Sequence, residues 1–418
     1  MSGAAPGEEV PAEPEDFWQR VAREVADDLA VDAVDRDRAG KPPYGEVARL
    51  RESGLPSVLT PPCASGRGTG WRNAGAIVRR IAAADTSVGE LLARHYALSW
   101  TARFYATPEH AEALEARAVR ENWLWSGAIG SPDVSGQLPR GTEDALTLTP
   151  TADGYRLRGQ RDLASAVTVA DRFVLDAECV PTNECMVVLV DPGLPGISRD
   201  LWQDRFGQRL AGAGTVHFDD VTLGADAVLG TTTPDEDVIA PHAALAPLAL
   251  RLMLAHAALG AAQGALAEAR DLSRALAHQR QSNDAVLTGA GGLPPVPGGD
   301  ADLLLALGES ALATHTAASV LHRATDAMER AVAAGRKLSP DQCADTTAHV
   351  AAAEAVTVRE APRVCERVLE LSLPDAEGLD RFWRNVRALA GHRPAGPMLR
   401  AVGEHFLSTG RVPSAPWN

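Results

Sequence analysis

The sequence has few of the residues that build disulfide-linked or metal-bound cores. Its five cysteines form no CxxC pair and no zinc spacing; they are Cys63, Cys179, Cys185, Cys343 and Cys365. We therefore expect free thiols rather than disulfides, and no catalytic cysteine. His315 and His322 lie two helical turns apart, too far for a metal pair, and the acidic residues form no metal site either. No metal is expected.

Positive charge is scarce as well. The chain has 40 Lys and Arg residues against 55 Asp and Glu, which gives a net charge of −15. Nucleic acids and anionic membranes attract basic surfaces, so neither is expected as a partner. No apolar run approaches the roughly 20 residues that span a bilayer, and residues 1–17 lack the basic start and apolar core of a signal peptide. A cytoplasmic protein is predicted.

The length and the hydrophobic pattern predict several packed units. A chain of 418 residues is too long for one ordinary core, so we expect two or three. Residues 1–14 are rich in Pro, Glu and Ala and are predicted to be disordered. Apolar residues recur at helical steps over 15–120, alternate as in strands over 121–235, and return to the helical period over 236–418. This order predicts an N-terminal helical domain, a β domain and a C-terminal helical bundle.

Three segments carry recognisable motifs. GYRLRG at 154–159 predicts a strand pair, and DRFGQRLAGAGTVHF at 204–218 predicts a loop of small residues that leads into a half-buried strand. LDRFWRN at 379–385 precedes a final helix. In this order the motifs resemble those of the acyl-CoA dehydrogenase superfamily. The segment 379–385 resembles its flavin-dependent monooxygenase branch, which includes dibenzothiophene monooxygenase.

The resemblance implies a fold, a cofactor and partners. The fold is mainly helical with a β middle domain: an N-terminal helical domain, a β-barrel-like domain and a C-terminal four-helix bundle. In that branch reduced FMN comes from a separate flavin reductase, and one oxygen atom is delivered to a small-molecule substrate; FAD is the other flavin considered. Such bundles bury helix faces between subunits, so a homodimer or homotetramer is expected.

Matched motif by motif, the resemblance also implies site residues. The expected catalytic residues are His392, Ser165 and His95. The residues expected to bind the cofactor are Trp125, Ser126, Ser131, Gln208, Arg209 and Arg280. Those expected in the substrate pocket are Tyr96 and Asn385. Neutral donors in an apolar cavity suit flavin oxygenation, and arginine suits a phosphate or carboxylate.

The chain departs from the family pattern at several of these motifs. Leu389 stands where the first histidine of the family's "H-x-x-H-D-P" segment is expected, and Arg393 replaces its aspartate. Leu163 replaces the aromatic residue of the serine motif. The loop AGAG at 211–214 has lost both hydroxyls of the family's "T-A-S-G", and Gly127 offers no side-chain donor on the first strand. The site is therefore expected to be retuned.

These losses leave three hypotheses. The leading one is a two-component flavin-dependent monooxygenase acting on a small or medium apolar metabolite in specialised biosynthesis. The second is an enzyme of the same fold that has lost flavin and catalyses a redox-neutral reaction such as cyclisation or elimination. The third is a non-catalytic oligomeric binding subunit. Flavin binding separates the first from the other two. Dehydrogenation is disfavoured because no carboxylate stands out as the base that it needs.

Overall fold

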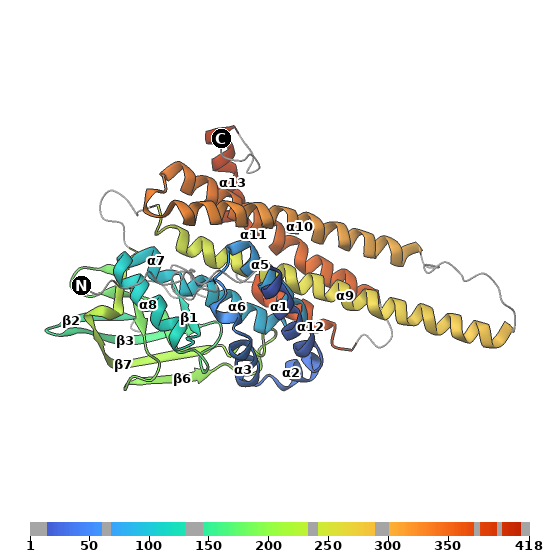
Figure 1. The fold of residues 1–418 in the computed structure, drawn as a ribbon, viewed down its shortest axis with the longest axis horizontal. Coiled ribbons are helices and arrows are strands. Elements are labelled where there is room, and N and C mark those ends of the chain that lie inside the picture. Colours follow the sequence, from blue (N-terminus) through green and yellow to red (C-terminus); the bar gives the residue numbers. More distant parts are fainter. Residues whose placement is uncertain are drawn as a thin grey trace, which may run out of the picture.

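Helices form both ends of the chain and one sheet forms its middle, as Figure 1 shows. This computed structural model describes residues 15–60, 68–129, 145–232, 241–288, 301–371, 377–390 and 395–410. The sheet lies at one end of the molecule, and helices α9 (Leu245–Thr288) and α10 (Ala301–Ala334) extend away from the other end. The predicted order of helices, strands and helices is confirmed. The segment 1–14, predicted to be disordered, lies outside the described residues.

The N-terminal helices surround α6 (Thr86–Ser99), which packs against both other parts of the molecule. The remaining elements of this part are α1 (Glu15–Ala30), α2 (Ala33–Ala39), α3 (Tyr44–Ser53), η1 (Leu55–Ser57), α5 (Trp71–Ala84), α7 (Thr101–Tyr105) and α8 (Pro108–Arg120). The carboxylate of Asp85 begins α6 because it accepts the backbone N–H groups of Ser87 and Val88 at 3.1 and 3.2 Å. Most of α6 is buried because it lies between the sheet and the long helices.

The sheet has eight strands in the order β6-β7-β3-β2-β4-β5-β8, with β1 paired to β4. The strands are β1 (Trp125–Ala128), β2 (Thr147–Thr151), β3 (Gly154–Leu163), β4 (Arg172–Cys179), β5 (Glu184–Val190), β6 (Ile197–Leu201), β7 (Gly214–Gly224) and β8 (Val228–Thr231), with the short helix η2 (Ala225–Ala227) before β8. Both β1 and β2 run parallel to β4, and the other pairs are antiparallel. The predicted alternation of β7 is confirmed, because Val216 and Phe218 are buried while Thr215 and His217 are half-buried.

The C-terminal part packs α9 and α10 against α11 and closes with two shorter helices. Its remaining elements are η3 (Gly335–Lys337), α11 (Pro340–Glu370), α12 (Asp380–Ala390) and α13 (Ala395–Thr409). Ser339 and Gln342 form a capping box at the start of α11. Helix α9 also touches α5 closely, since a side chain at Gly260 would overlap the carbonyl oxygen of Arg79.

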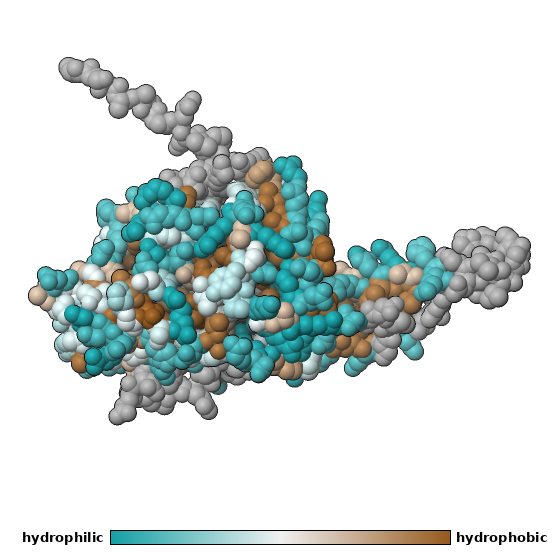
Figure 2. Space-filling view, turned by 90° about the horizontal axis from the view of Figure 1, so that it is seen from below, coloured by the Kyte–Doolittle hydropathy of each residue, from teal (hydrophilic) through white to brown (hydrophobic). Residues whose placement is uncertain are grey.

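Two long helices correct the expectation that no apolar segment of the chain is long enough to span a bilayer. Both α9 and α10 are long and apolar enough to cross a membrane, by length and composition alone. The most apolar window of α9 is 78% buried inside the protein, so α9 is a core helix. That of α10 is only 22% buried. Figure 2 shows the arm of α9 and α10 projecting from the body, with hydrophobic residues among hydrophilic ones along it.

Candidate functional site

Strand β1 connects helix α6 with the turn between β3 and β4. The backbone N–H of Trp125 donates to Nδ1 of His95 at 3.1 Å. The hydroxyl of Ser126 donates to the carbonyl oxygen of Ser165 at 2.6 Å. All four residues are at most 2% exposed. Four of the predicted site residues therefore lie together between the sheet and α6. We call the contact formed by these four residues the seam.

The turn between β3 and β4 rests on the small-residue loop 211–214. The backbone N–H of Ala166 donates to the carbonyl oxygen of Ala211 at 2.7 Å, and that of Val167 donates to Gly212 at 2.9 Å. Ala166 has a φ of 59°, a left-handed conformation that costs an alanine about 1–2 kcal/mol. The family's serine motif has glycine at this position. This chain therefore holds a strained residue directly after the predicted catalytic serine.

Helix α12 holds the loop 204–210 that precedes these small residues. Oδ1 of Asn385 accepts the backbone N–H of Gln208 at 2.6 Å, and Gln208 has a left-handed φ of 55°. A side chain at Gly207 would overlap the carbonyl oxygen of Arg384, so the loop lies directly on the helix. Asn385 was predicted to line the substrate pocket. In the structure its amide fixes the backbone of the loop.

The other polar side chains of the motif at 379–385 tie α12 to three further helices. The contacts are Arg381 with Glu268 of α9, Trp383 Nε1 with Glu366 of α11 at 3.1 Å, and Arg384 with Asp37 of α2 at 2.5 Å. Phe382 lies in the core between α9, α11 and α12. The motif therefore joins the loop 204–210 to the N-terminal helix α2 and to the C-terminal helices α9 and α11.

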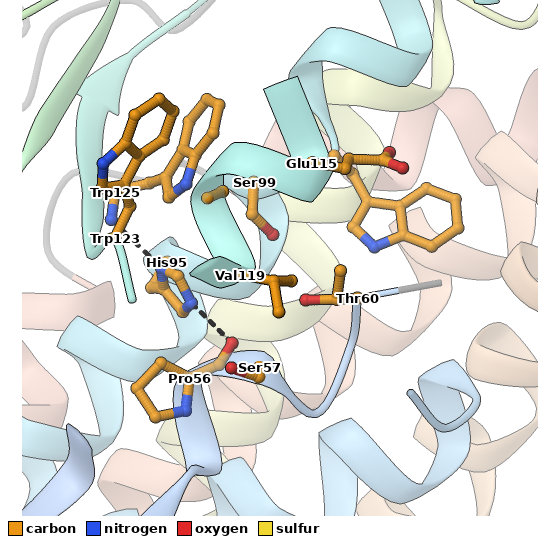
Figure 3. Close-up of a pocket in the computed structure, with 11 residues that line it drawn as sticks. Pro56, Ser57, Thr60, His95, Ser99, Glu115, Val119, Trp123 and Trp125 are labelled. Atoms are coloured by element: carbon orange, nitrogen blue, oxygen red, sulfur yellow. Dashed lines mark hydrogen bonds between the residues drawn. The ribbon is translucent and has the colours of Figure 1, made fainter. Parts of the chain in front are cut away.

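Both ring nitrogens of His95 are occupied by backbone groups (Figure 3). Nδ1 accepts from Trp125, which leaves the proton on Nε2, and Nε2–H donates to the carbonyl oxygen of Pro56 at 2.8 Å. Burial lowers the pKa of His95 to about 4, so the ring is neutral at pH 7. The hydroxyl of Tyr96 is similarly engaged, since it donates to the carbonyl oxygen of Leu55 at 2.6 Å. His95 therefore has no free ring nitrogen with which to perform the expected catalytic role.

The hydroxyl of Ser165 is a free polar group on the seam. Its Oγ is buried and has no hydrogen-bond partner among the described residues. Buried hydroxyls are normally satisfied, so this oxygen has capacity for a ligand. Oε1 of Gln208 is likewise buried and without a partner in the described part of the chain. The seam therefore offers one neutral hydroxyl, and the loop 204–210 offers one neutral acceptor.

The remaining four predicted residues lie away from the seam or outside the side chains that the structure describes. Nε of Arg209 donates to the carbonyl oxygen of Arg205 at 3.0 Å, and its Nη1 lies 3.9 Å from Asp37, so Arg209 is engaged within the protein. His392 and Ser131 lie outside the described residues. Arg280 lies in α9, beyond the last side chain of that helix that the structure describes.

Two departures from the family pattern have a structural reason. Gly127 has a φ of 152°, and a side chain there would overlap the backbone of Val174, so β1 has no room for asparagine or serine. Leu389 packs against the hydrophobic cores on either side of α12. The position expected to hold a histidine is therefore part of the apolar packing.

Two cavities lie beside the N-terminal helices. The smaller, of about 20 Å³, reaches His95 and Trp125 and is drawn in Figure 3. The larger, of about 700 Å³, is walled by Trp71, Trp100 and His242 and contains none of the predicted site residues. Its size suits a small-molecule ligand. No motif in the sequence marks this cavity, because its walls come from segments far apart in the chain and Trp100, which lines both cavities, belongs to no motif.

Known proteins resemble this chain over nearly its whole length. It is 29% identical over 409 residues to a dibenzothiophene monooxygenase of Rhodococcus qingshengii, covering 93% of this chain and 92% of that protein. It is 25% identical over 397 residues to a probable FMNH2-dependent monooxygenase, SfnC, of Pseudomonas putida, covering 94% and 95%. No family model matches the chain.

Solved structures agree with these relatives. FMN-bound TdsC from Paenibacillus sp. A11-2 superimposes with a TM-score of 0.80 at 27% identity, covering 96% of this chain and 99% of TdsC. Butyryl-CoA dehydrogenase from Megasphaera elsdenii superimposes with a TM-score of 0.73 at 18% identity, covering 97% and 100%, which shows the shared fold. The chain is therefore a homologue of the FMNH2-dependent and dibenzothiophene monooxygenases, built on the acyl-CoA dehydrogenase fold.

Proposed function

We propose that the protein is a two-component flavin-dependent monooxygenase that works in the cytoplasm. It takes reduced FMN from a separate reductase and inserts one atom of O2 into a small or medium organic metabolite; the other atom leaves as water and the flavin leaves oxidised. The observation that carries the proposal is similarity to FMNH2-dependent relatives over more than nine-tenths of the chain.

The seam residues would border a bound isoalloxazine ring rather than enclose it, because the cavity of about 20 Å³ that reaches His95 and Trp125 is too small for the ring. When bound, reduced FMN supplies the two electrons that activate O2. Ser165 offers a buried hydroxyl without a partner in the described structure, which fits a hydrogen bond to the ring or to the developing oxygen species. Trp125 and Ser126 lie on strand β1, which is held in place by the hydrogen bond between Trp125 and His95. Buried neutral groups of this kind exclude water without adding a charge.

We also propose that the protein assembles as a homodimer or homotetramer through its projecting helices. Leu304, Leu305 and Leu312 of α10 are each more than half exposed, as are Leu399 and Phe406 of α13. Large exposed apolar side chains along one helix are typical of a surface that a partner covers. A second copy that packed against this face of α10 would bury its leucines and leave less of the projecting helices exposed.

Label incorporation tests the activity. Purified protein, FMN, NADH and a flavin reductase would be incubated under ¹⁸O2 with dibenzothiophene, for which the Rhodococcus relative is named, and with indole, which is bound in another TdsC structure of 26% identity. We expect one labelled oxygen in at least one product, and loss of the label when the reductase is omitted. Oxidation that proceeds equally with added hydrogen peroxide and no flavin would contradict the proposal.

A further inference from the structure

The cavity of about 700 Å³ takes no part in the function proposed above. Its walls come from the start of α5, from α7 and α8, and from the end of α10. None of the four residues of the seam lines it. A volume of this size suits a small organic molecule. The cavity is therefore a candidate for a second ligand site, beside the seam.

Aromatic side chains form one wall of this cavity. The indole rings of Trp71 and Trp100 meet edge to face, with ring centroids 5.3 Å apart. Nε1 of Trp100 donates to the carbonyl oxygen of Leu59 at 2.9 Å, which fixes the ring. Leu59, Ala111 and Val332 add apolar surface. Rigid aromatic faces of this kind favour a flat, aromatic ligand.

Two polar atoms of the lining side chains are unsatisfied within the described ranges. They are Nε1 of Trp71 and Nδ1 of His242, and both are buried. Nε2 of His242 lies 3.0 Å from the carbonyl oxygen of Arg103, which places the ring proton on Nε2 and leaves Nδ1 as an acceptor. The indole N–H of Trp71 can only donate. Because buried polar groups are normally hydrogen-bonded, this pair indicates a ligand that has both an acceptor and a donor.

The charges that line the cavity balance one another. The charged side chains among its lining residues are Arg103, Arg336, Glu112 and Glu329. Nη2 of Arg103 donates to Oε2 of Glu115 at 2.7 Å. Nη2 of Arg336 donates to the carbonyl oxygen of Ala106 at 2.8 Å. Both guanidinium groups are thus engaged within the protein, and two bases accompany two acids, so the cavity favours a neutral ligand over an ion.

We propose that this cavity binds a neutral aromatic molecule that accepts a hydrogen bond from Trp71 and donates one to His242. Phenols have both functions. The two polar atoms are buried within the wall, so the rings of Trp71 and His242 turn toward the ligand as it binds, a side-chain adjustment that is common on binding. Burial lowers the pKa of His242, so its ring is neutral at pH 7 and stays an acceptor.

Trp100 relates this site to the seam. It lines both the large cavity and the small cavity of Figure 3, which reaches His95 and Trp125. A ligand in the large cavity therefore packs against a residue that also faces the smaller cavity. Two sources share the ligand chemistry, namely the substrate of the oxygenation and a separate effector. Binding itself does not depend on the proposed oxygenation; only the assignment of the ligand as substrate rests on it.

Binding can be measured by equilibrium dialysis without flavin. We expect 2,6-dihydroxynaphthalene to bind at least about tenfold more tightly than 6-hydroxy-2-naphthoate, which has the same rings and a charge. Val332→Trp and Ala333→Trp add a ring at two lining positions near the end of α10 and should abolish this binding. Ala116→Trp, at an exposed position of α8 outside the lining, is the matched control and should bind as wild type. Wild-type affinity in both α10 variants would overturn the site.

Two conservative variants test the hydrogen bonds. Trp71→Phe keeps an aromatic ring and removes the donor, so the affinities for 2,6-dihydroxynaphthalene and 2,6-dimethoxynaphthalene should both fall about tenfold. In His242→Gln the amide can still donate to the carbonyl oxygen of Arg103 while the acceptor is lost. Only the dihydroxy compound should then bind more weakly, because the ethers have no proton to donate. Unchanged affinities in both variants, with circular dichroism as in wild type, would overturn the assigned hydrogen bonds.

Turnover separates the two sources of the ligand. The wild-type protein and Ala333→Trp would be given FMN, NADH, a flavin reductase and O2 together with 2,6-dihydroxynaphthalene. If the compound gains one oxygen atom in wild type and none in Ala333→Trp, the cavity holds substrate. If it binds wild type and is recovered unchanged, the cavity holds an effector. A protein that binds 2,6-dihydroxynaphthalene but not FMN would refute the monooxygenase and keep this site.

Discussion

Nδ1 of His95 accepts the backbone N–H of Trp125 at 3.1 Å, so a helix histidine holds the first strand of the sheet. Its other nitrogen donates to the carbonyl oxygen of Pro56, in the short helix η1, at 2.8 Å. The ring thus joins three parts of the chain that are distant in sequence. A histidine expected to act on a ligand instead positions the strand that carries Trp125 and Ser126.

Replacing this histidine should destabilise the fold. His95→Ala leaves the N–H of Trp125 and the carbonyl of Pro56 buried and unpaired, which should cost about 2–4 kcal/mol in the free energy of unfolding. Urea denaturation measures this. His217→Ala, at a half-exposed histidine paired with Asp200, is the matched control and should change stability little. A His95→Ala protein as stable as wild type, but inactive, would restore the catalytic role.

The same histidine should make stability depend on pH. Burial lowers the pKa of His95 from 6.5 to about 4 in the folded protein. Between these values the unfolded chain takes up a proton that the folded chain does not, so the free energy of unfolding falls as the pH drops from 6.5 to 4. The full effect is about 3 kcal/mol. Wild type and His95→Asn should therefore converge in stability over this window; a constant gap between them would show that the ring does not titrate as described.

Replacing Ser165 and Ser126 with alanine should have different effects on the stability of the protein. Ser165→Ala removes a buried hydroxyl without a partner in the described structure, so stability should stay the same or rise, while FMN binding should weaken about tenfold. Ser126→Ala removes a hydrogen bond of 2.6 Å and should cost about 1 kcal/mol in stability. Paired unfolding and flavin titrations would show this. A destabilised Ser165→Ala with normal flavin affinity would make Ser165 a structural residue.

The strained turn after Ser165 offers a test of backbone conformation. Ala166→Gly relieves a left-handed alanine and should cost little, because the relieved strain offsets both the lost methyl group and the greater freedom of glycine in the unfolded chain. Ala261→Gly, in the buried part of α9, is the control and should cost about 1–2 kcal/mol. Equal losses for both variants in thermal or urea unfolding would show that Ala166 is not strained.

Assembly should depend on the exposed face of α10. Leu305→Glu with Leu312→Glu places charges on the surface proposed to be covered, and should shift the protein to monomer in light scattering after size exclusion. Val31→Glu adds the same charge at a position that is 84% exposed, away from α10, and should leave the assembly unchanged. An oligomer that survives the double variant would place the interface elsewhere.

The sequence was informative where a pattern is local. The alternation of Val216 and Phe218 predicted strand β7, and the helical period predicted the long C-terminal helices. The contacts between site residues could not be predicted from the sequence, since Gln208 and Asn385 form a hydrogen bond although they are 177 positions apart. Whether His95 has a free nitrogen depends on backbone groups at Pro56 and Trp125, which no spacing shows.

The measurement that tests the proposed function most directly is a titration of the purified protein with oxidised and reduced FMN, followed by fluorescence and calorimetry. We predict saturable binding in the micromolar range, tighter for the reduced form and weakened in Ser165→Ala. Absence of binding at millimolar FMN, in a protein that unfolds cooperatively, would contradict a flavin-dependent monooxygenase and direct the search to redox-neutral chemistry on this fold.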